Sequence, residues 1–185
     1  MSAKVLVDAE HFRRTVNRIA HEVVERHVGS ELPLAVVGIH TNGVPIARRI
    51  AALIAEFTTT TPPFGTIDIG LYRDDIGVGS GQRPGVPRVG DTQLDFDVTS
   101  HAILLVDDVL YTGRTIRAAI DALFDYGRPS LVQLACLVDR GHRELPIRPD
   151  YVGKNLPTSR GERVTVRVAE LEGVDEILLE RGGTN

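Results

Sequence analysis

The chain alternates between short apolar runs and longer stretches in which apolar residues recur at helical spacing. Largely apolar runs cover 34–39, 103–106 and 131–138, and such runs are typical of strands that are buried on both faces. Between them, 44–54 and 116–123 have the spacing of amphipathic helices. This alternation predicts an α/β fold with a central parallel sheet flanked by helices.

The pattern also predicts elements outside this central part. Residues 8–28 have the spacing of a first helix, with Asp8 as its N-cap. The other expected segments are a strand at 66–72, a loop at 151–158, an edge strand at 163–168 and a short apolar piece at 177–179.

Residues 73–91 contain five Gly and two Pro and show no periodicity. A loop of this length inside a compact domain is usually functional or disordered. We expect it to be a flexible lid that closes over a bound substrate and excludes water. The alternative is a disordered insertion without a function.

Length and composition are consistent with one domain over residues 1–185, with 42% hydrophobic residues available for a core. No apolar run is long enough to span a membrane, and the first residues lack the pattern of a signal peptide, so a cytosolic protein without a membrane partner is expected. The single Cys136 lies in an apolar run, which predicts a buried structural thiol. The net charge of −4 argues against general attraction to nucleic acid and leaves a local basic face possible.

The most informative stretch is 103–115, where two acids and a small polar turn follow the buried strand. Asp107 and Asp108 stand where the strand is expected to end, and a helix is expected after the turn at 112–115. A helix N-terminus offers unpaired N–H groups and a positive dipole end, which suit a phosphate. Gly113 lets the backbone approach closely, and the carboxylates are placed to accept bonds from sugar hydroxyls or to help hold a metal. A phosphate beside a vicinal diol is a ribose 5-phosphate, whereas the plainer alternative is an ordinary strand-to-helix turn.

Two further polar loops follow strands of the same predicted sheet. Residues 38–43 combine glycines at both ends with a hydroxyl and N–H groups, a pattern that can cradle a second anion such as pyrophosphate. Asn-Gly is first of all a turn signal, so this pattern alone is weak. Residues 139–143 form the third loop. Because parallel strands end at one edge of a sheet, we expect the three loops to converge on a single site.

The first helix carries a basic stripe. Arg14, Arg18 and His21 fall at i, i+4 and i+7, with Asn17 between them. From the spacing alone, a solvated helix face with glutamates balancing the charge is the favoured interpretation.

Residues 103–115 resemble, along their whole length, the phosphoribosyl-pyrophosphate (PRPP) signature of the type I phosphoribosyltransferases. Similarity to the PyrR family of pyrimidine operon regulators extends over most of the chain, through residues 13–22, 71–75, 127–130, 137–147 and 151–159. The resemblance implies a bifunctional protein with the type I phosphoribosyltransferase fold. It implies binding to pyr leader mRNA in response to UMP or UTP, and conversion of uracil and PRPP to UMP and pyrophosphate. It is also consistent with a homodimer or a higher homo-oligomer.

The resemblance further implies roles for individual residues, with Mg²⁺ bound mainly through PRPP rather than by protein ligands. The implied catalytic residues are Asp107, Asp108 and Arg140. The implied PRPP and phosphate contacts are Thr41, Asn42, Arg73, Val109, Leu110, Tyr111, Thr112, Gly113, Arg114 and Thr115. The implied uracil contacts are Val138, Arg140 and Val164, and the implied RNA contacts are Arg14, Asn17, Arg18, His21 and Lys154. No general base is evident.

One departure from the family pattern stands in the first polar loop. The chain has Thr41-Asn42-Gly43 where relatives commonly have Thr-Arg-Gly. Loss of a guanidinium removes a charge-assisted contact to pyrophosphate, so weaker catalysis is expected. Two alternatives follow: an RNA-binding regulator whose catalytically weak site senses nucleotides, and a phosphoribosyltransferase for purines or orotate that does not bind RNA. The 139–147 loop, which is particular to the resembled family, argues against the second.

Overall fold

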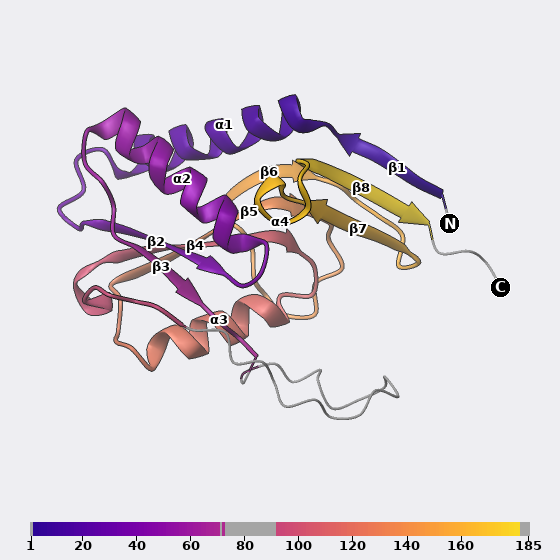
Figure 1. Cartoon of the computed structure of the whole chain (residues 1–185). Helices are drawn as coiled ribbons and strands as arrows, with labels where there is room; N and C mark the ends of the chain where they lie inside the picture. Colours follow the sequence, from indigo (N-terminus) through magenta and orange to yellow (C-terminus); the bar gives the residue numbers. More distant parts are fainter. Residues whose placement is uncertain (1, 71, 73–91, 182–185) are drawn as a thin grey trace.

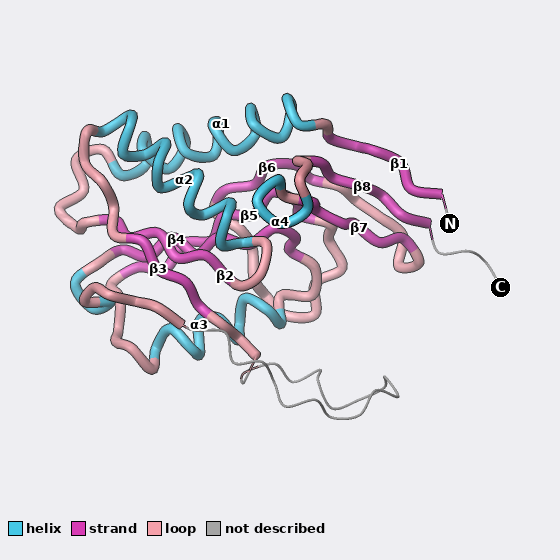
Figure 2. Tube along the Cα trace, in the orientation of Figure 1, coloured by secondary structure: helices cyan, strands magenta, loops and turns pink. Residues whose placement is uncertain are grey.

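A parallel sheet of five strands forms the centre of the protein in the computed structural model, which describes residues 2–70, 72 and 92–181 (Figures 1 and 2). The strand order is β3 (Phe64–Ile67), β2 (Leu34–Ile39), β4 (Ala102–Leu110), β5 (Leu131–Asp139) and β6 (Tyr151–Asn155). Each neighbouring pair is parallel. The lid prediction at 73–91 lies outside the described residues, and the single-domain prediction stays a prediction.

Helices cover both faces of this sheet, which confirms the predicted fold class. Helices α1 (Ala9–His27) and α2 (Gly43–Thr58) lie on one face, and α3 (Arg114–Phe124) lies on the other (Figure 1). The predicted N-cap of α1 is confirmed, because the Asp8 carboxylate accepts a hydrogen bond from the His11 N–H at 2.9 Å.

The apolar run of β4 is buried on both faces, as predicted. Leu104 and Val106 belong to the core beneath α1 and α2, whereas Ile103 and Leu105 belong to the core beneath α3. Successive side chains of a strand point to opposite faces, so one continuous apolar run serves both cores. Cys136 is buried in the second core, and burial raises the pKa of its thiol, in agreement with the predicted structural role.

Strand β4 is longer than predicted. It continues through both acids to Leu110, and its ladder with β5 pairs Asp107 with Cys136 and Val109 with Val138. The prediction that the acids follow the strand is therefore wrong. Asp is a poor strand former, but backbone partners on the neighbouring strand decide the local structure here.

The prediction of a loop at 151–158 is also wrong at its start. Residues 151–155 form β6, whose backbone pairs with β5, as in the register partners Val138 and Lys154. The strand predicted at 66–72 instead covers 64–67.

A second, antiparallel sheet of three strands lies beside the first (Figure 1), with the order β1, β8, β7. The predicted edge strand at 163–168 is confirmed as β7, and the apolar piece at 177–179 lies within the central strand β8. Strand β1 was not predicted. The bounds are β1 Ser2–Val7, β7 Glu162–Arg167 and β8 Glu176–Arg181, with the short helices η2 Val98–Ser100 and α4 Ala169–Glu172.

The start of α2 packs directly on β4 because Gly43 has no side chain. A Cβ at Gly43 would lie 2.4 Å from the carbonyl oxygen of Val106, and one at Gly38 would lie 2.6 Å from the Cα of Val44. These glycines therefore permit close packing of a strand, a loop and a helix. Among the described residues, no helix has both the length and the apolar character needed to cross a membrane.

We expect Gly43→Ala to lower the free energy of unfolding by about 1 to 3 kcal/mol, because the added methyl group overlaps the β4 backbone. Alanine is the better helix former, so a loss would report the steric conflict rather than helix propensity. Urea denaturation measures the change. The matched control is Gly161→Ala, whose Cβ would meet nothing within 4 Å. Equal stability of the two variants would contradict the proposed close contact.

Candidate functional site

A cavity of about 260 Å³ opens where β4 ends and α3 begins. It is lined by three residues of β4, the turn before α3, the first residues of that helix and one residue of a later loop. These residues are Asp107, Val109, Leu110, Tyr111, Thr112, Gly113, Arg114, Thr115, Ile116 and Glu144. The predicted phosphate turn and one predicted catalytic acid therefore share one cavity.

The turn before α3 has the backbone geometry of an anion cradle. Gly113 has φ of +93°, in the left-handed region that favours glycine, and α3 begins at the next residue. The Thr112 hydroxyl oxygen accepts a bond from the Arg114 N–H at 3.3 Å. The first-turn N–H groups of a helix have no partners within the helix, so together with the dipole they favour an anion in this cavity.

The two acids of β4 have different surroundings. Asp107 is buried and lines the cavity, and its Oδ1 accepts the Asp108 N–H at 3.0 Å. Asp108 is half-buried; its Oδ1 accepts the Val109 N–H at 2.7 Å, and its Oδ2 accepts the Asn42 side-chain amide at 2.8 Å. Asp107 thus faces the phosphate turn, whereas Asp108 is held from the side of α2.

The second predicted loop reaches the same edge through Asn42. Its amide nitrogen donates to Asp108 and also to the carbonyl oxygen of Val166 on β7, at 3.1 Å. Thr41 is exposed, and the His40–Thr41 peptide bond is cis. The predicted contact of this loop with pyrophosphate stays a prediction.

Arg143 supports the phosphate turn from the third loop, and the sequence analysis missed it. Its guanidinium donates to the carbonyl oxygens of Tyr111 (2.8 Å) and Ile147 (2.8 Å). It also donates to the carboxylate of Asp139 at 2.5 Å. The only sequence signal was its place in a polar loop after a buried strand, because backbone carbonyls leave no trace in a sequence.

Arg140 is buried, and its side chain is committed to the protein. It donates to the Glu162 carbonyl oxygen at 2.7 Å and to the Thr158 hydroxyl at 3.2 Å. The guanidinium also lies over the Tyr111 ring, 4.2 Å from its centroid. A second cavity, of about 440 Å³, lies beside it and is lined by Asp139, Arg140, Gly141, His142, Asn155, Pro157 and Thr158.

The two valines predicted near the base belong to the core. Val138 on β5 is fully buried, and Val164 on β7 is nearly so. Contact of Val138 with a ligand would therefore have to use its backbone atoms.

The basic stripe of α1 packs beside β6. Arg18 donates to the carbonyl oxygens of Val152 (2.9 Å) and Gly153 (2.7 Å), the two residues before Lys154. A Cβ at Gly153 would lie 2.6 Å from the side chain of Thr15 on α1. The helix and the strand that carry the predicted RNA contacts are thus in direct contact.

The other side chains of this stripe differ in their partners. Arg14 is exposed and pairs with Glu10 at 2.5 Å, and the His21 ring stacks on Phe57 with centroids 3.9 Å apart. Asn17 is half-buried. Lys154 is exposed and has no ion pair within the described ranges 2–70, 72 and 92–181.

Comparison with known proteins identifies the family. A model of the phosphoribosyl transferase domain matches residues 2–170. The Bifunctional protein PyrR of Chloroflexus aurantiacus is 54% identical over 182 residues, which cover 98% of this chain and 97% of that protein. The protein of the same name from Thermus thermophilus is 58% identical over 179 residues and 96% of both chains. The chain belongs to the PyrR family. The predicted membership of PyrR and of the phosphoribosyltransferases is therefore confirmed.

Solved structures support the fold of this PyrR chain independently. Hypoxanthine phosphoribosyltransferase from Trypanosoma cruzi, in complex with its product IMP, has a TM-score of 0.73 over 96% of this chain and 94% of that one, at 20% identity. At this identity the likeness shows the fold alone. The homo-oligomer and the cytosolic location stay predictions.

We expect Arg143→Gln to lower the free energy of unfolding by about 2 to 3 kcal/mol, because it leaves carbonyl oxygens and the Asp139 carboxylate without their donor. The Arg143–Asp139 side chains are only 21% and 16% exposed. The matched control is Arg117→Gln, whose pair with Asp121 is 56% and 51% exposed, and for which a loss below about 1 kcal/mol is expected. Urea denaturation distinguishes the two, and equal losses would contradict the supporting role of Arg143.

Proposed function

We propose that the chain transfers the phosphoribosyl group of PRPP to uracil, forming UMP and pyrophosphate, and that it binds the leader of a pyr mRNA in response to uridine nucleotides. The cavity at the end of β4 carries the enzymatic part. There the first turn of α3 and the carboxylate of Asp107 line one space, and a ribose 5-phosphate needs this combination of an anion cradle and an acceptor for its hydroxyls. Membership of the PyrR family supports uracil over a purine or orotate.

In the proposed reaction the cavity and the neighbouring Asp108 have separate roles. The turn at 112–115 binds the 5-phosphate through N–H groups and hydroxyls. A nitrogen of uracil displaces pyrophosphate at the anomeric carbon, so positive charge grows on the ribose and negative charge grows on the leaving group. Asp107 and Asp108 bind the ribose hydroxyls and stabilise the growing positive charge.

The pyrophosphate side depends on the loop at 40–43 and on Mg²⁺. The described residues contain no cluster of three or more His, Cys, Asp or Glu that could hold a metal. In this proposal the oxygens of PRPP would hold most of the coordination of the ion. The carboxylates of Asp107 and Asp108 are hard oxygen donors suited to support it. The bound ion would neutralise charge on the leaving pyrophosphate. Thr41 is proposed to contact the same anion, and Arg73 lies outside the described residues.

The base side is proposed at the second cavity. Tyr111 connects the two cavities, because it lines the first and its ring contacts two residues that line the second, Arg140 and His142. Arg140 shapes this side by fixing the Tyr111 ring, and uracil contacts from Val138 or Val164 would come from backbone atoms.

Replacing Asp107 or Asp108 by Asn keeps the size of the side chain and removes its charge. We expect turnover in a UMP-forming assay with uracil, PRPP and Mg²⁺ to fall by roughly a hundredfold for each variant, because one preorganised electrostatic partner is lost. Asp121→Asn, on the exposed face of α3, is the matched control and should stay within about twofold. Near-normal turnover in both site variants would overturn the assigned roles.

RNA binding is proposed at the joined surface of α1 and β6. Arg14, Arg18 and Lys154 are exposed cations of this surface, and Arg18 also fixes the helix to the strand through its bonds to Val152 and Gly153. Asn17 and His21 complete the face. The contact would be mainly to phosphates, since cations that neutralise the RNA backbone release its condensed counterions.

We expect Lys154→Gln to weaken binding to a pyr leader RNA and to reduce the slope of log affinity against log salt by about one. UMP formation should stay within about twofold of the parent. The control Arg128→Gln removes a charge from the exposed loop before β5. It should leave both the RNA binding and the UMP formation unchanged. Binding measured over a salt series tests this, and an unchanged slope for Lys154→Gln would place the RNA elsewhere.

A second candidate function is a regulator whose catalytically weak site senses nucleotides. Asn42 favours it, because this residue brings no positive charge to the predicted pyrophosphate loop and its amide is bound to Asp108 and Val166. A UMP-forming assay beside RNA binding with and without UMP separates the two: slow turnover with a nucleotide effect on RNA affinity would favour the sensor. Any such coupling must be reciprocal.

A further inference from the structure

Helix α2 contacts the second sheet at two points on one side. Asn42, its N-cap, has helical dihedral angles, and Arg49 follows seven positions later. Seven residues make about two turns, so the two side chains project from the same side of the helix. Asn42 contacts β7 at Val166, and Arg49 contacts the turn that follows β7.

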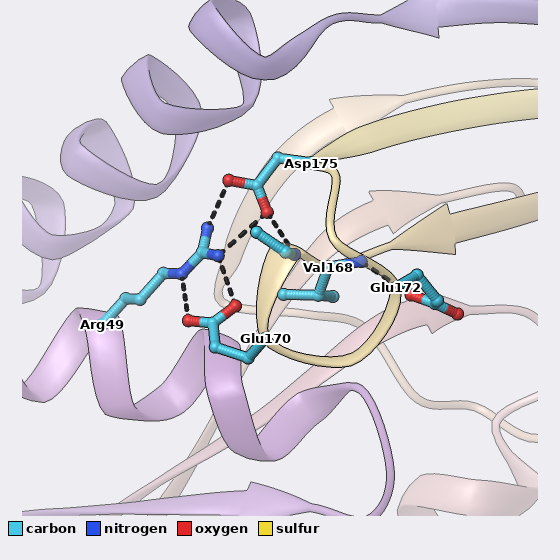
Figure 3. Close-up of polar contacts among 6 residues, drawn as sticks. Arg49, Val168, Glu170, Glu172 and Asp175 are labelled. Carbon is cyan, nitrogen blue, oxygen red and sulfur yellow. Dashed lines mark hydrogen bonds and ion pairs between the residues drawn. The ribbon is translucent and has the colours of Figure 1, made fainter.

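Arg49 binds two carboxylates at once (Figure 3). Its Nε and Nη2 donate to Glu170 at 2.8 and 2.5 Å. Its Nη1 and Nη2 donate to Asp175 at 2.9 Å each. Two fork-like pairs of charge-assisted hydrogen bonds hold a planar guanidinium in one orientation.

One of these carboxylates, Asp175, and the nearby carboxylate of Glu172 also fix the backbone between β7 and β8 (Figure 3). Asp175 also accepts the Ala169 N–H at 2.8 Å, and Glu172 accepts the Val168 N–H at 2.9 Å. The hydrogen bonds from Arg49 lower the pKa of Glu170. Burial alone would raise the pKa of Asp175, but the bonds from Arg49 and the Ala169 N–H lower it overall. Both acids are therefore charged at neutral pH, and the end of β7 is anchored to α2.

At the other point, Asn42 uses both hydrogens of its amide nitrogen. One goes to Oδ2 of Asp108 and the other to the Val166 carbonyl oxygen. An amide nitrogen has two hydrogens, and the remaining side-chain oxygen is an acceptor, which does not suit an anion. In this arrangement Asn42 serves the carboxylate rather than a pyrophosphate.

We infer that Asn42 is a positioning residue that orients the Asp108 carboxylate toward the ribose hydroxyls, with the Arg49-anchored end of β7 as its fixed support. The inference rests on the proposed function, in which Asp108 binds the diol. With Oδ2 bound to Asn42 and Oδ1 bound to the Val109 N–H, rotation of the carboxylate is prevented. Each oxygen keeps a lone pair for a hydroxyl.

The test compares UMP with 2′,3′-dideoxyuridine 5′-monophosphate, which has the same base and phosphate but no diol. Titration calorimetry gives the affinity of the parent and of Asn42→Ala for each. We expect Asn42→Ala to lower the affinity for UMP by about tenfold, the effect of one charge-assisted hydrogen bond. The affinity for the dideoxy nucleotide should stay within about twofold of the parent. In an Asp108→Asn background, Asn42→Ala should lower the affinity for UMP little further, because Asn42 acts through Asp108.

The outcomes separate this inference from the proposed function. A parent that binds both nucleotides equally would overturn the diol role of the acids, and the inference with it. If the parent binds UMP more tightly than the dideoxy nucleotide and Asn42→Ala keeps this full preference, the inference alone is overturned. Equal weakening of both nucleotides would also overturn it, since a purely structural role acts on the whole ligand.

A second pair of variants tests the support from Arg49. Arg49→Gln should also reduce the preference for UMP, by less than Asn42→Ala. The control is Arg48→Gln. The Arg48 guanidinium lies over the Phe64 ring, 4.5 Å from its centroid, and its loss should keep the full preference for UMP. If Arg49→Gln fails to fold, Glu170→Gln weakens the same anchor more mildly. If Arg49→Gln or Glu170→Gln folds and keeps the full preference for UMP, β7 is not the support of Asn42.

Discussion

The parallel ladder between β4 and β5 fixes the geometry on which the candidate site depends. It continues past the apolar run of β4, so that Asp107 stands opposite Cys136 and Val109 opposite Val138. The acids are therefore part of a sheet rather than of a loop. Because α3 begins only a short turn later, the ladder also sets the distance between the carboxylates and the phosphate turn. A site held on a strand is more precise than one held on a loop.

Much of the fold could be predicted, because burial on both faces leaves a strong pattern. The strand at 34–39 and the apolar part of β4 follow directly from their apolar runs. Strand β6 could not be found in this way. Its residues, Tyr151 to Asn155, include a glycine, a lysine and an asparagine, and their extended form comes from pairing with β5. The extension of β4 through its acids has the same tertiary origin.

The candidate site was predictable where it is contiguous in sequence. Residues 109–115 and Asp107 line one cavity. Residues that act through distant backbone atoms were not predictable: Arg143 binds the Tyr111 carbonyl, and nothing in the sequence of either marks that pairing. Gly43 in the first polar loop has a packing role that the sequence did not reveal, because the lack of a side chain permits its contact with β4.

The register of β6 has a consequence for communication between the two proposed functions. Lys154 is the ladder partner of Val138, so the strand proposed to touch RNA and the strand proposed to border the base are neighbours. Adjacent strands lie about 4.8 Å apart. One row of backbone hydrogen bonds therefore separates the backbone that is proposed to border the base from the residue that is proposed to contact RNA.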